Sequence, residues 1–337
     1  MAEVIGRALA GSADAVLRAY ERFQAIPVDM DLSGEAPDPV DESQTTIARA
    51  ESVTGPGTFL GRARRTLRFL PTSASGWWFE RTDLPDNLPI KSSVYNVWTT
   101  NRNIVLCSGS PHNYMRMVEH IVALRLGMGI DNLLIKVDSG DPPLFNRGSM
   151  DIVESLERAG IARHGAPPVF ITVREPVSMA GPNGSMLAFL PAEKGMRHLT
   201  IDCAIDFPNA IGRQRVKFIL NRKVFRHGAF ARTNTTSGMK LYSHTIGKLF
   251  ADVRNLGYTD ENILIAGRKK YVNEPRMLHE GKSLEAVWHR AVLDLLAALS
   301  LLDEGRLIGT VLSFKAGHNL DVIMCRRLVK DGILVRA

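Results

Sequence analysis

The segment EAVWHRAVLDLLAAL, from Glu285 to Leu299, is the feature of this sequence that most constrains its fold. Its composition is helix-forming, and from Ala291 to Leu299 every residue except Asp294 is apolar. A helix that is apolar over such a length packs inside a domain, so we expect Asp294 to be buried. A buried carboxylate requires a partner, a metal ion or a raised pKa. The same carboxylate interrupts the longest apolar run, and no run reaches the roughly 18 residues of a transmembrane helix.

The composition is typical of a cytoplasmic protein with two packed domains. The chain has 337 residues, of which 45% are hydrophobic and 23% charged, and it shows no secretion-signal pattern. Its three cysteines are far apart and odd in number, which predicts reduced thiols. The net charge of +7 favours an anionic small-molecule substrate and also suits contact with an anionic membrane surface. No nucleic-acid-binding signature accompanies the charge, so we expect no nucleic-acid partner.

The N-terminal residues 1–47 differ in composition and in apolar pattern from the rest of the chain. Residues 2–25 alternate apolar and polar positions, which predicts short amphipathic helices with Ser12 as a cap. Residues 27–43 hold three prolines and six acids without a basic residue, which is typical of a poorly ordered linker. We therefore interpret residues 1–47 as an arm outside the core, and we expect a chain starting near residue 47 to stay folded.

The remaining sequence predicts an α+β fold with two similar halves, residues 48–166 and 167–337, and an active-site cleft between them. Residues 58–71 and 76–84 look like paired strands joined by the turn PTSASG. The other expected strands are 132–138, 185–192, 198–207, 215–220 and 307–318, and the expected helices are 111–129, 150–161, 244–256, 283–302 and 319–330.

Four places carry side chains suited to catalysis. They are Glu119 with His120 on a helix, Thr233 after Arg232 in a polar loop, His289 with Asp294, and His318 with Lys315 where a strand reaches a glycine-containing loop. A Glu–His pair is common on amphipathic helices, a polar loop is usually solvated, and His289 could lie at the surface. Asp294 and His318 are the strongest signals, because one is a carboxylate in an apolar helix and the other follows a rigid strand.

The sequence resembles a known family over roughly residues 50–330. The motifs that carry the resemblance are VTGPGTFLG, WWFERTDL, MVEHIVALRLGMGIDNLLIKVD, FARTN, EAVWHRAVLDLL and LIGTVLSFKAGHNLD, in this order. The family is the zinc-dependent UDP-3-O-acyl-N-acetylglucosamine deacetylases of lipid A biosynthesis. The resemblance implies two α+β halves and a UDP-linked amino sugar with a fatty acyl chain as substrate.

The resemblance also implies roles for individual residues. Glu119 matches the general base and His120 the first zinc ligand. Asp294 matches the zinc-binding carboxylate, His318 the loop histidine that stabilises charge or protonates the leaving amine, and Thr233 a threonine near the reacting carbonyl. Zinc is therefore the implied cofactor.

The second zinc histidine does not fit the family spacing. In the family it lies four residues before the aspartate, whereas His289 lies five before Asp294 and Arg290 takes the four-residue position. On a regular helix four steps return a side chain to within about 40° of its start, but five leave it about 140° away. A π-bulge would restore the register. We predict instead that His289 binds no metal and that Arg290 pairs with Asp294 and fills the place of the zinc.

Other positions also depart from the family. Phe59 replaces a histidine of the opening motif, Arg147 replaces the aspartate of an Asp-Gly-Ser turn, and Ala298 replaces an acid that orients the loop histidine. We assign Arg290, Phe59 and Lys315 to substrate contact or to filling of the site.

Two hypotheses about function follow. In the first, the chain is an amide hydrolase that removes an N-acyl group from an amino-sugar-like or related anionic substrate, with Glu119 as base and His318 as acid. In the second, it is a non-catalytic paralogue that binds an acylated sugar nucleotide or a protein partner and regulates the pathway. The retained residues favour the enzyme, whereas the altered zinc position and the N-terminal arm favour the paralogue.

Overall fold

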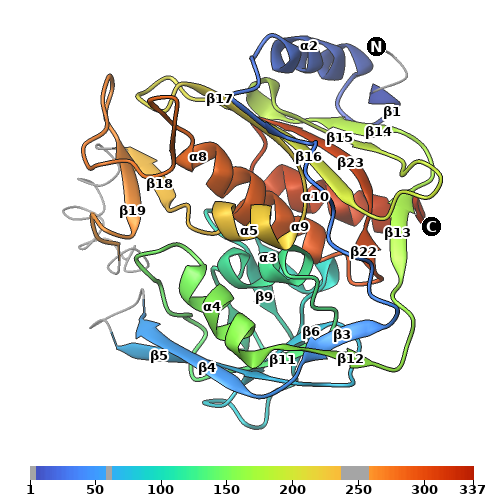
Figure 1. The fold of residues 1–337 in the computed structure, drawn as a ribbon, viewed down its shortest axis with the longest axis vertical. Coiled ribbons are helices and arrows are strands. Elements are labelled where there is room, and N and C mark those ends of the chain that lie inside the picture. The colour runs from blue at the N-terminus through green and yellow to red at the C-terminus, as the bar shows by residue number, and fades with distance from the viewer. Residues whose placement is uncertain (1–4, 58–62, 237–257) are drawn as a thin grey trace.

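The computed structural model describes residues 5–57, 63–236 and 258–337. Two β-sheets enclose a layer of helices, which gives the predicted α+β fold (Figure 1). No helix in these ranges is long and apolar enough to span a membrane.

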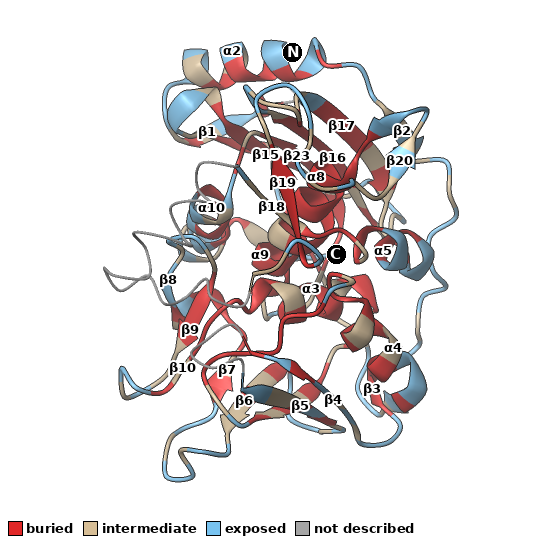
Figure 2. Ribbon diagram, turned by 90° about the vertical axis from the view of Figure 1, so that its left-hand side faces the viewer, coloured by how far each residue is buried: buried red, intermediate tan, exposed pale blue. Residues whose placement is uncertain are grey.

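The larger sheet has seven strands and is mixed in direction, because three of its neighbouring pairs are parallel and three antiparallel. In spatial order its strands are β1 (Arg7–Ala10), β14 (Val177–Ala180), β15 (Met186–Leu190), β23 (Gly309–Phe314), β16 (Leu199–Asp206), β17 (Arg213–Ile219) and β2 (Met30–Leu32). Its central strands are almost wholly buried, and Figure 2 shows the buried residues running through β15, β23 and β16.

The smaller main sheet has five strands. In spatial order they are β4 (Glu51–Pro56), β5 (Arg64–Leu70), β11 (Leu133–Val137), β6 (Trp77–Arg81) and β7 (Ile90–Lys91). The expected pairing of the two segments that became β5 and β6 was wrong, because β11 lies between them, antiparallel to β5 and parallel to β6. The buried face of β11 is apolar, so it gains more by entering the middle of this sheet than by lying at its edge.

The remaining strands of the described ranges form small separate sheets. They are β3 (Gln44–Ile47) with β12 (Ile161–His164), β8 (Val97–Thr99) with β9 (Val105–Cys107) and β10 (Tyr114–Met115), β13 (Phe170–Val173) with β22 (Arg306–Leu307) and β24 (Leu334–Arg336), β18 (Thr233–Thr236) with β19 (Ile263–Ala266), and β20 (Leu278–His279) with β21 (Lys282–Ser283). The segment expected to be helical from residue 111 forms β10 first, and its helix begins at Glu119.

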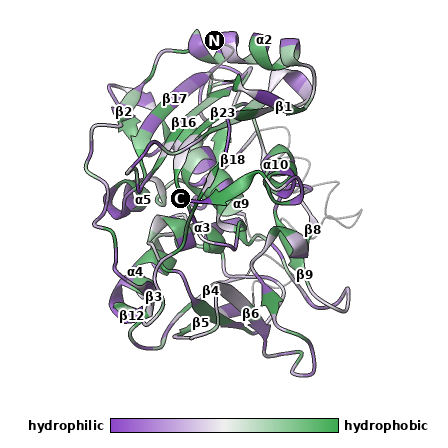
Figure 3. Ribbon diagram, turned by 90° about the vertical axis from the view of Figure 1, so that its right-hand side faces the viewer, coloured by the Kyte–Doolittle hydropathy of each residue, from purple (hydrophilic) through white to green (hydrophobic). Residues whose placement is uncertain are grey.

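The helices between the sheets form the core of the molecule. They are α3 (Glu119–Gly127), α4 (Met150–Ala159), α5 (Arg222–Gly228), α8 (Glu285–Trp288), η5 (His289–Leu295), α9 (Leu296–Ser300) and α10 (His318–Lys330). Two short 3-10 turns, η2 (Val94–Asn96) and η3 (Pro182–Gly184), lie in connections. Helix α9 is buried throughout and packs on α3, and Figure 3 shows its hydrophobic character. The helix expected at 244–256 lies outside the described residues.

The N-terminal residues belong to the larger sheet, which differs from the arm expected for 1–47. Helix α2 (Ala13–Gln24) begins at the predicted cap, where the Ser12 side chain accepts a hydrogen bond from the amide of Ala15. It packs on the outer face of the seven-stranded sheet, and β1 and β2 form the two edges of that sheet. The division of the rest into 48–166 and 167–337 stays a prediction.

The acidic linker is held by basic residues of the core. Asp29 accepts hydrogen bonds from the Arg215 amide and from Lys282, and Glu35 pairs with Lys223. Its composition resembled that of a disordered tether because the compensating charges lie more than 180 residues away along the chain.

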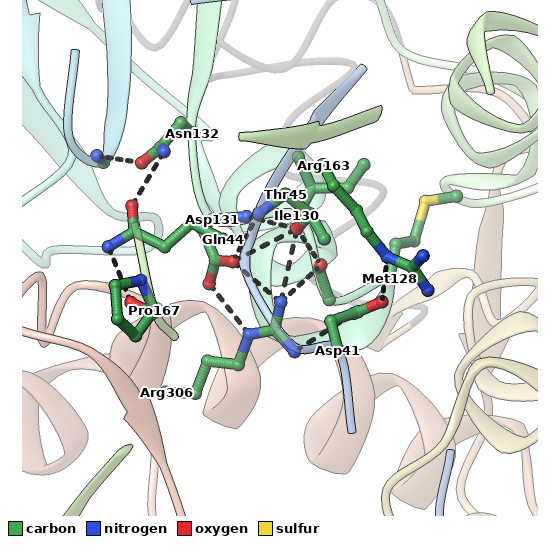
Figure 4. Close-up of polar contacts among 12 residues, drawn as sticks. Asp41, Gln44, Thr45, Met128, Ile130, Asp131, Asn132, Arg163, Pro167 and Arg306 are labelled. Atoms are coloured by element: carbon green, nitrogen blue, oxygen red, sulfur yellow. Dashed lines mark hydrogen bonds and ion pairs between the residues drawn. The ribbon is translucent and has the colours of Figure 1, made fainter. Parts of the chain in front are cut away.

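A polar network ties the two main parts of the chain together (Figure 4). Arg306, in β22, donates to both carboxylate oxygens of Asp131 at 2.8 and 2.7 Å. It also contacts the hydroxyl of Thr45 at 3.3 Å and lies 3.6 Å from Asp41. Because Arg306 comes from the end of the chain and its partners from the first half, this network joins the C-terminal part of the chain to the first half.

Candidate active site

The helix that carries His289 and Asp294 contains a π-turn. Residues 285–300 run without a break through α8, η5 and α9, and η5 is a π-helix. A π-turn holds one residue more than a regular turn, so side chains five apart return to the same side. As a result, Nδ1 of His289 lies 3.4 Å from Oδ1 of Asp294.

The predicted pair between Arg290 and Asp294 was therefore wrong. Arg290 donates to Asp321 at 2.6 Å and to the hydroxyl of Ser313 at 3.3 Å. The extra residue in the turn rotates Arg290 away from Asp294 and brings His289 to the side that Arg290 was expected to occupy.

Side chains from three helices meet around Asp294. The rings of His120 and His289 are 5.4 Å apart between centroids. The His318 side chain, at the start of α10, places Nε2 3.6 Å from the same Asp294 oxygen. Glu119 is buried at the start of α3 and lies within the electrostatic reach of both His318 and Asp294. Five of the residues identified in the sequence thus form one cluster: Glu119, His120, His289, Asp294 and His318.

Burial and neighbouring charges set the proton affinities of this cluster. Burial raises the pKa of Glu119, and the charge of His318 offsets this only in part. Burial acts to lower the pKa of His318, but the charges of Asp294 and Glu119 outweigh it and raise that pKa. Burial acts to raise the pKa of Asp294, but His289 and His318 hold it below its usual range. Burial together with His289 lowers the pKa of His120 to about 3. The site therefore favours an ionised Asp294, a neutral His120 and a protonated His318.

Hydrogen bonds from the segments that flank α3 hold Glu119 and His120 in place. The amide of Ile104 donates to Oε2 of Glu119 at 3.0 Å, and the hydroxyl of Ser149 donates to the carbonyl of His120 at 2.9 Å. Ser149 follows Gly148, whose φ of +62° suits glycine. Arg147, before this turn, binds Glu154 and Asp151 on α4.

A cavity of about 700 Å³ opens beside the cluster. Asp294, His318, Arg290 and Lys315 line it together with apolar side chains such as Phe207. Nζ of Lys315 lies 3.9 Å from the carboxylate of Asp206, which also lines the cavity.

Thr233 stands near this cavity. It is half-buried at the start of β18, and the next residue, Asn234, lines the cavity wall. Phe59 lies outside the described residues.

Two further residues of the site, Tyr258 and Asp321, were not predicted from the sequence. Burial and the charge of Glu119 raise the pKa of Tyr258 to about 12, so its phenol lies in the electrostatic field of the base. Asp321 is fully buried and binds Arg290. Nothing local in the sequence distinguishes Tyr258, whereas Asp321 could have been found, since it lies three residues after His318 on one helix.

The unpaired atoms of the cluster fit a metal ion. Nδ1 of His120, Nε2 of His289 and Oδ1 of Asp294 are buried and have no hydrogen-bond partner among the described residues. Two imidazole nitrogens and a carboxylate oxygen are a donor set that zinc accepts. In the described ranges no three side chains of His, Cys, Asp or Glu already lie in positions from which they could bind one metal ion together. The donor chemistry thus fits zinc, with the donors gathered but not closed around one point.

Comparison with known proteins agrees with the geometry. The family model for LpxC, UDP-3-O-acyl N-acetylglycosamine deacetylase, matches residues 44–330. The chain belongs to this family. A UDP-3-O-acyl-N-acetylglucosamine deacetylase of Trichormus variabilis is 30% identical over 289 residues, covering 85% of this chain and 98% of the relative. One of Bdellovibrio bacteriovorus is 30% identical over 291 residues, covering 85% and 89%.

Membership of the LpxC family accounts for most of the chain. The match includes all the clustered residues, from Glu119 to His318, and supports deacetylase-type chemistry. Residues 1–43, which supply β1, α2 and β2, lie before the matched range.

Proposed function

We propose that the protein is a zinc-dependent deacetylase that hydrolyses the N-acyl group of an acylated, UDP-linked amino sugar. The observation that carries this proposal is the π-turn, which brings His289 beside His120 and Asp294 although the sequence spacing is one residue too long. The names of the relatives supply the substrate class.

Three side chains would hold the metal. His120 and His289 would each offer a buried ring nitrogen and Asp294 a carboxylate oxygen. When bound, zinc polarises an amide carbonyl and makes water more acidic. Because the pKa of Asp294 is low, its oxygen stays available as an anionic ligand at neutral pH.

Glu119 and His318 would move the protons. Glu119 takes a proton from the water that attacks the amide carbon, and its raised pKa makes it a stronger base than an exposed carboxylate. His318, kept protonated by Asp294 and Glu119, donates a proton to the nitrogen as the C–N bond breaks. The products are acetate, which keeps the water oxygen, and the protonated amine, which gains two protons in all. The proton taken up by Glu119 replaces the one that His318 gave to the nitrogen, so the atoms of one water molecule balance.

The cavity suits such a substrate. Its apolar lining can receive an acyl chain, and Lys315 offers a positive charge to a diphosphate. Thr233 stays a candidate for a contact near the reacting carbonyl, because Asn234 beside it lines the cavity.

A non-catalytic protein that binds the same substrate is the second candidate. The observation that favours it is the lack of a closed group of three metal donors among the residues described.

The test uses purified full-length protein and UDP-3-O-acyl-N-acetylglucosamine. We expect stoichiometric zinc by elemental analysis and release of acetate, with both zinc content and folding kept but acetate release lost in Glu119→Gln. Substrate binding by equilibrium dialysis without acetate release would favour the non-catalytic candidate. A full-length protein that binds no zinc would overturn the proposal of a zinc-dependent deacetylase.

A further inference from the structure

We propose that Arg290 and Asp321 form a buried clamp that selects the π-turn and thereby positions His289 for metal binding. This inference rests on the proposed function, since it assigns the clamp to the zinc site. Arg290 lines the cavity, but both residues are assigned here an effect that acts through His289, so both are positioning residues.

The clamp joins the two helices that carry the site. Arg290 follows His289 directly in η5, and Asp321 lies one turn after His318 in α10. Nη2 of Arg290 is 2.6 Å from Oδ1 of Asp321, and the Ser313 hydroxyl of β23 lies 3.3 Å from the same nitrogen. The side chains are 7% and 0% exposed.

The two charges depend on each other. Nε and Nη1 of Arg290 and Oδ2 of Asp321 have no hydrogen-bond partner among the described residues. Removal of one partner from such a buried pair leaves an uncompensated charge, whereas an apolar pair of similar volume would fill the same space at no loss of stability. An ion pair at this position is therefore better explained by the geometry that it selects than by the stability that it adds.

The geometry in question is a choice between two helix registers. On a regular helix Arg290, four residues before Asp294, would face Asp294 and take the place of the metal. His289 would then point about 140° away from Asp294. In the π-turn Arg290 faces Asp321 instead, and His289 faces Asp294. Asp321 thus attracts the guanidinium of Arg290 away from Asp294. The guanidinium can reach Asp321 only if the helix holds one extra residue in this turn.

A set of variants separates this role from a purely structural one. Asp321→Asn leaves Arg290 with Asp294 as its nearest carboxylate, so the helix should revert to the regular register and zinc affinity should fall about 10- to 100-fold, as for other residues that orient metal ligands. Deletion of Ala291 in the same variant restores the four-residue spacing between His289 and Asp294. Zinc affinity should then return to near the wild-type value.

The matched control is a second buried ion pair, in strands β16 and β17 of the seven-stranded sheet. Arg215 and Asp202 form a second buried pair, with exposures of 8% and 7%, and Arg215 also binds carbonyls at the end of α2. Asp202→Asn should lower stability as Asp321→Asn does, but it should leave zinc affinity unchanged. If Asp321→Asn does not fold, the double variant Arg290→Met with Asp321→Leu takes its place, because it leaves no unpaired charge in the core.

The measurement is competition for Zn²⁺ alone between the full-length apoprotein and a chromogenic chelator. Loss of affinity in the clamp variant, rescue by the deletion and no loss in the control support the clamp. Wild-type affinity in the folded clamp variant overturns it and leaves the proposed function standing. A wild-type chain that binds no zinc overturns the proposed function itself, and the clamp with it.

Discussion

Replacement of Phe23 by alanine tests whether the N-terminal residues are part of the core. Phe23 is fully buried on the inner face of α2. Its ring lies 6.2 Å from that of Phe314 in β23, and the guanidinium of Arg215 lies 4.0 Å above it. Helix α2 therefore contacts the central strand of the seven-stranded sheet through this side chain.

The expected cost follows from these contacts. Truncation of a buried phenylalanine to alanine lowers the free energy of unfolding by about 3–5 kcal/mol. The cation–π contact with Arg215 adds about 0.5–2 kcal/mol where it is desolvated, so we expect a loss near 5 kcal/mol. A single domain has only about 5–15 kcal/mol in all, so Phe23→Ala should leave the protein close to unfolding.

The assay is equilibrium urea unfolding followed by circular dichroism. Val40→Ala is the control, because Val40 is 50% exposed in the same N-terminal region and its truncation should change stability by less than about 0.5 kcal/mol. A chain that begins at residue 44 should unfold at a much lower temperature than the full chain. If Phe23→Ala costs less than about 1 kcal/mol and the shortened chain melts normally, α2 is the add-on that the sequence suggested.

Three further predictions concern the site. Glu119→Gln should lower kcat by about 10²- to 10⁴-fold at unchanged zinc content, and full activity would exclude Glu119 as the base. His289→Ala should lower zinc affinity in chelator competition, whereas His227→Ala, at an exposed histidine whose ring contacts Trp288, should not; equal effects would show that His289 is not a ligand. Gly148→Ala should lower the free energy of unfolding by about 1–3 kcal/mol, because φ is +62° and the new Cβ would lie 2.5 Å from a carbonyl oxygen. Gly165→Ala is the control, since its Cβ would meet open space, and equal melting temperatures of the two variants would refute the strain at Gly148.

Local patterns predicted the elements that local physics determines. The sequence predicted three such elements, because capping and apolar periodicity act within a few residues. They are the Ser12 cap of α2, the glycine loop before α10 and the apolar helix 285–300. The grouping of Glu119, His120, Asp294 and His318 was anticipated through the family resemblance.

Long-range pairing decided what the sequence could not predict. The place of β11 between β5 and β6 depends on competition among strands distant in sequence. In the π-turn, Arg290 binds Asp321, a partner that lies 31 residues later in the chain. From the helix alone, Asp294 was the nearest carboxylate for that arginine, and so the wrong register was favoured.

The two edges of the seven-stranded sheet join segments that are far apart in the chain. Arg7 of β1 pairs with Val177, and Met30 of β2 pairs with Val216, so these strands wait for partners some 170 to 186 residues later in the chain. At about 5–20 residues per second, synthesis of that stretch takes roughly 9–37 s. Until then the inner face of α2 has no sheet to cover, and once β14 and β17 form, they present open edges that invite pairing with other chains. The N-terminal strands β1 and β2 cover both edges of the sheet and so block pairing with other chains there.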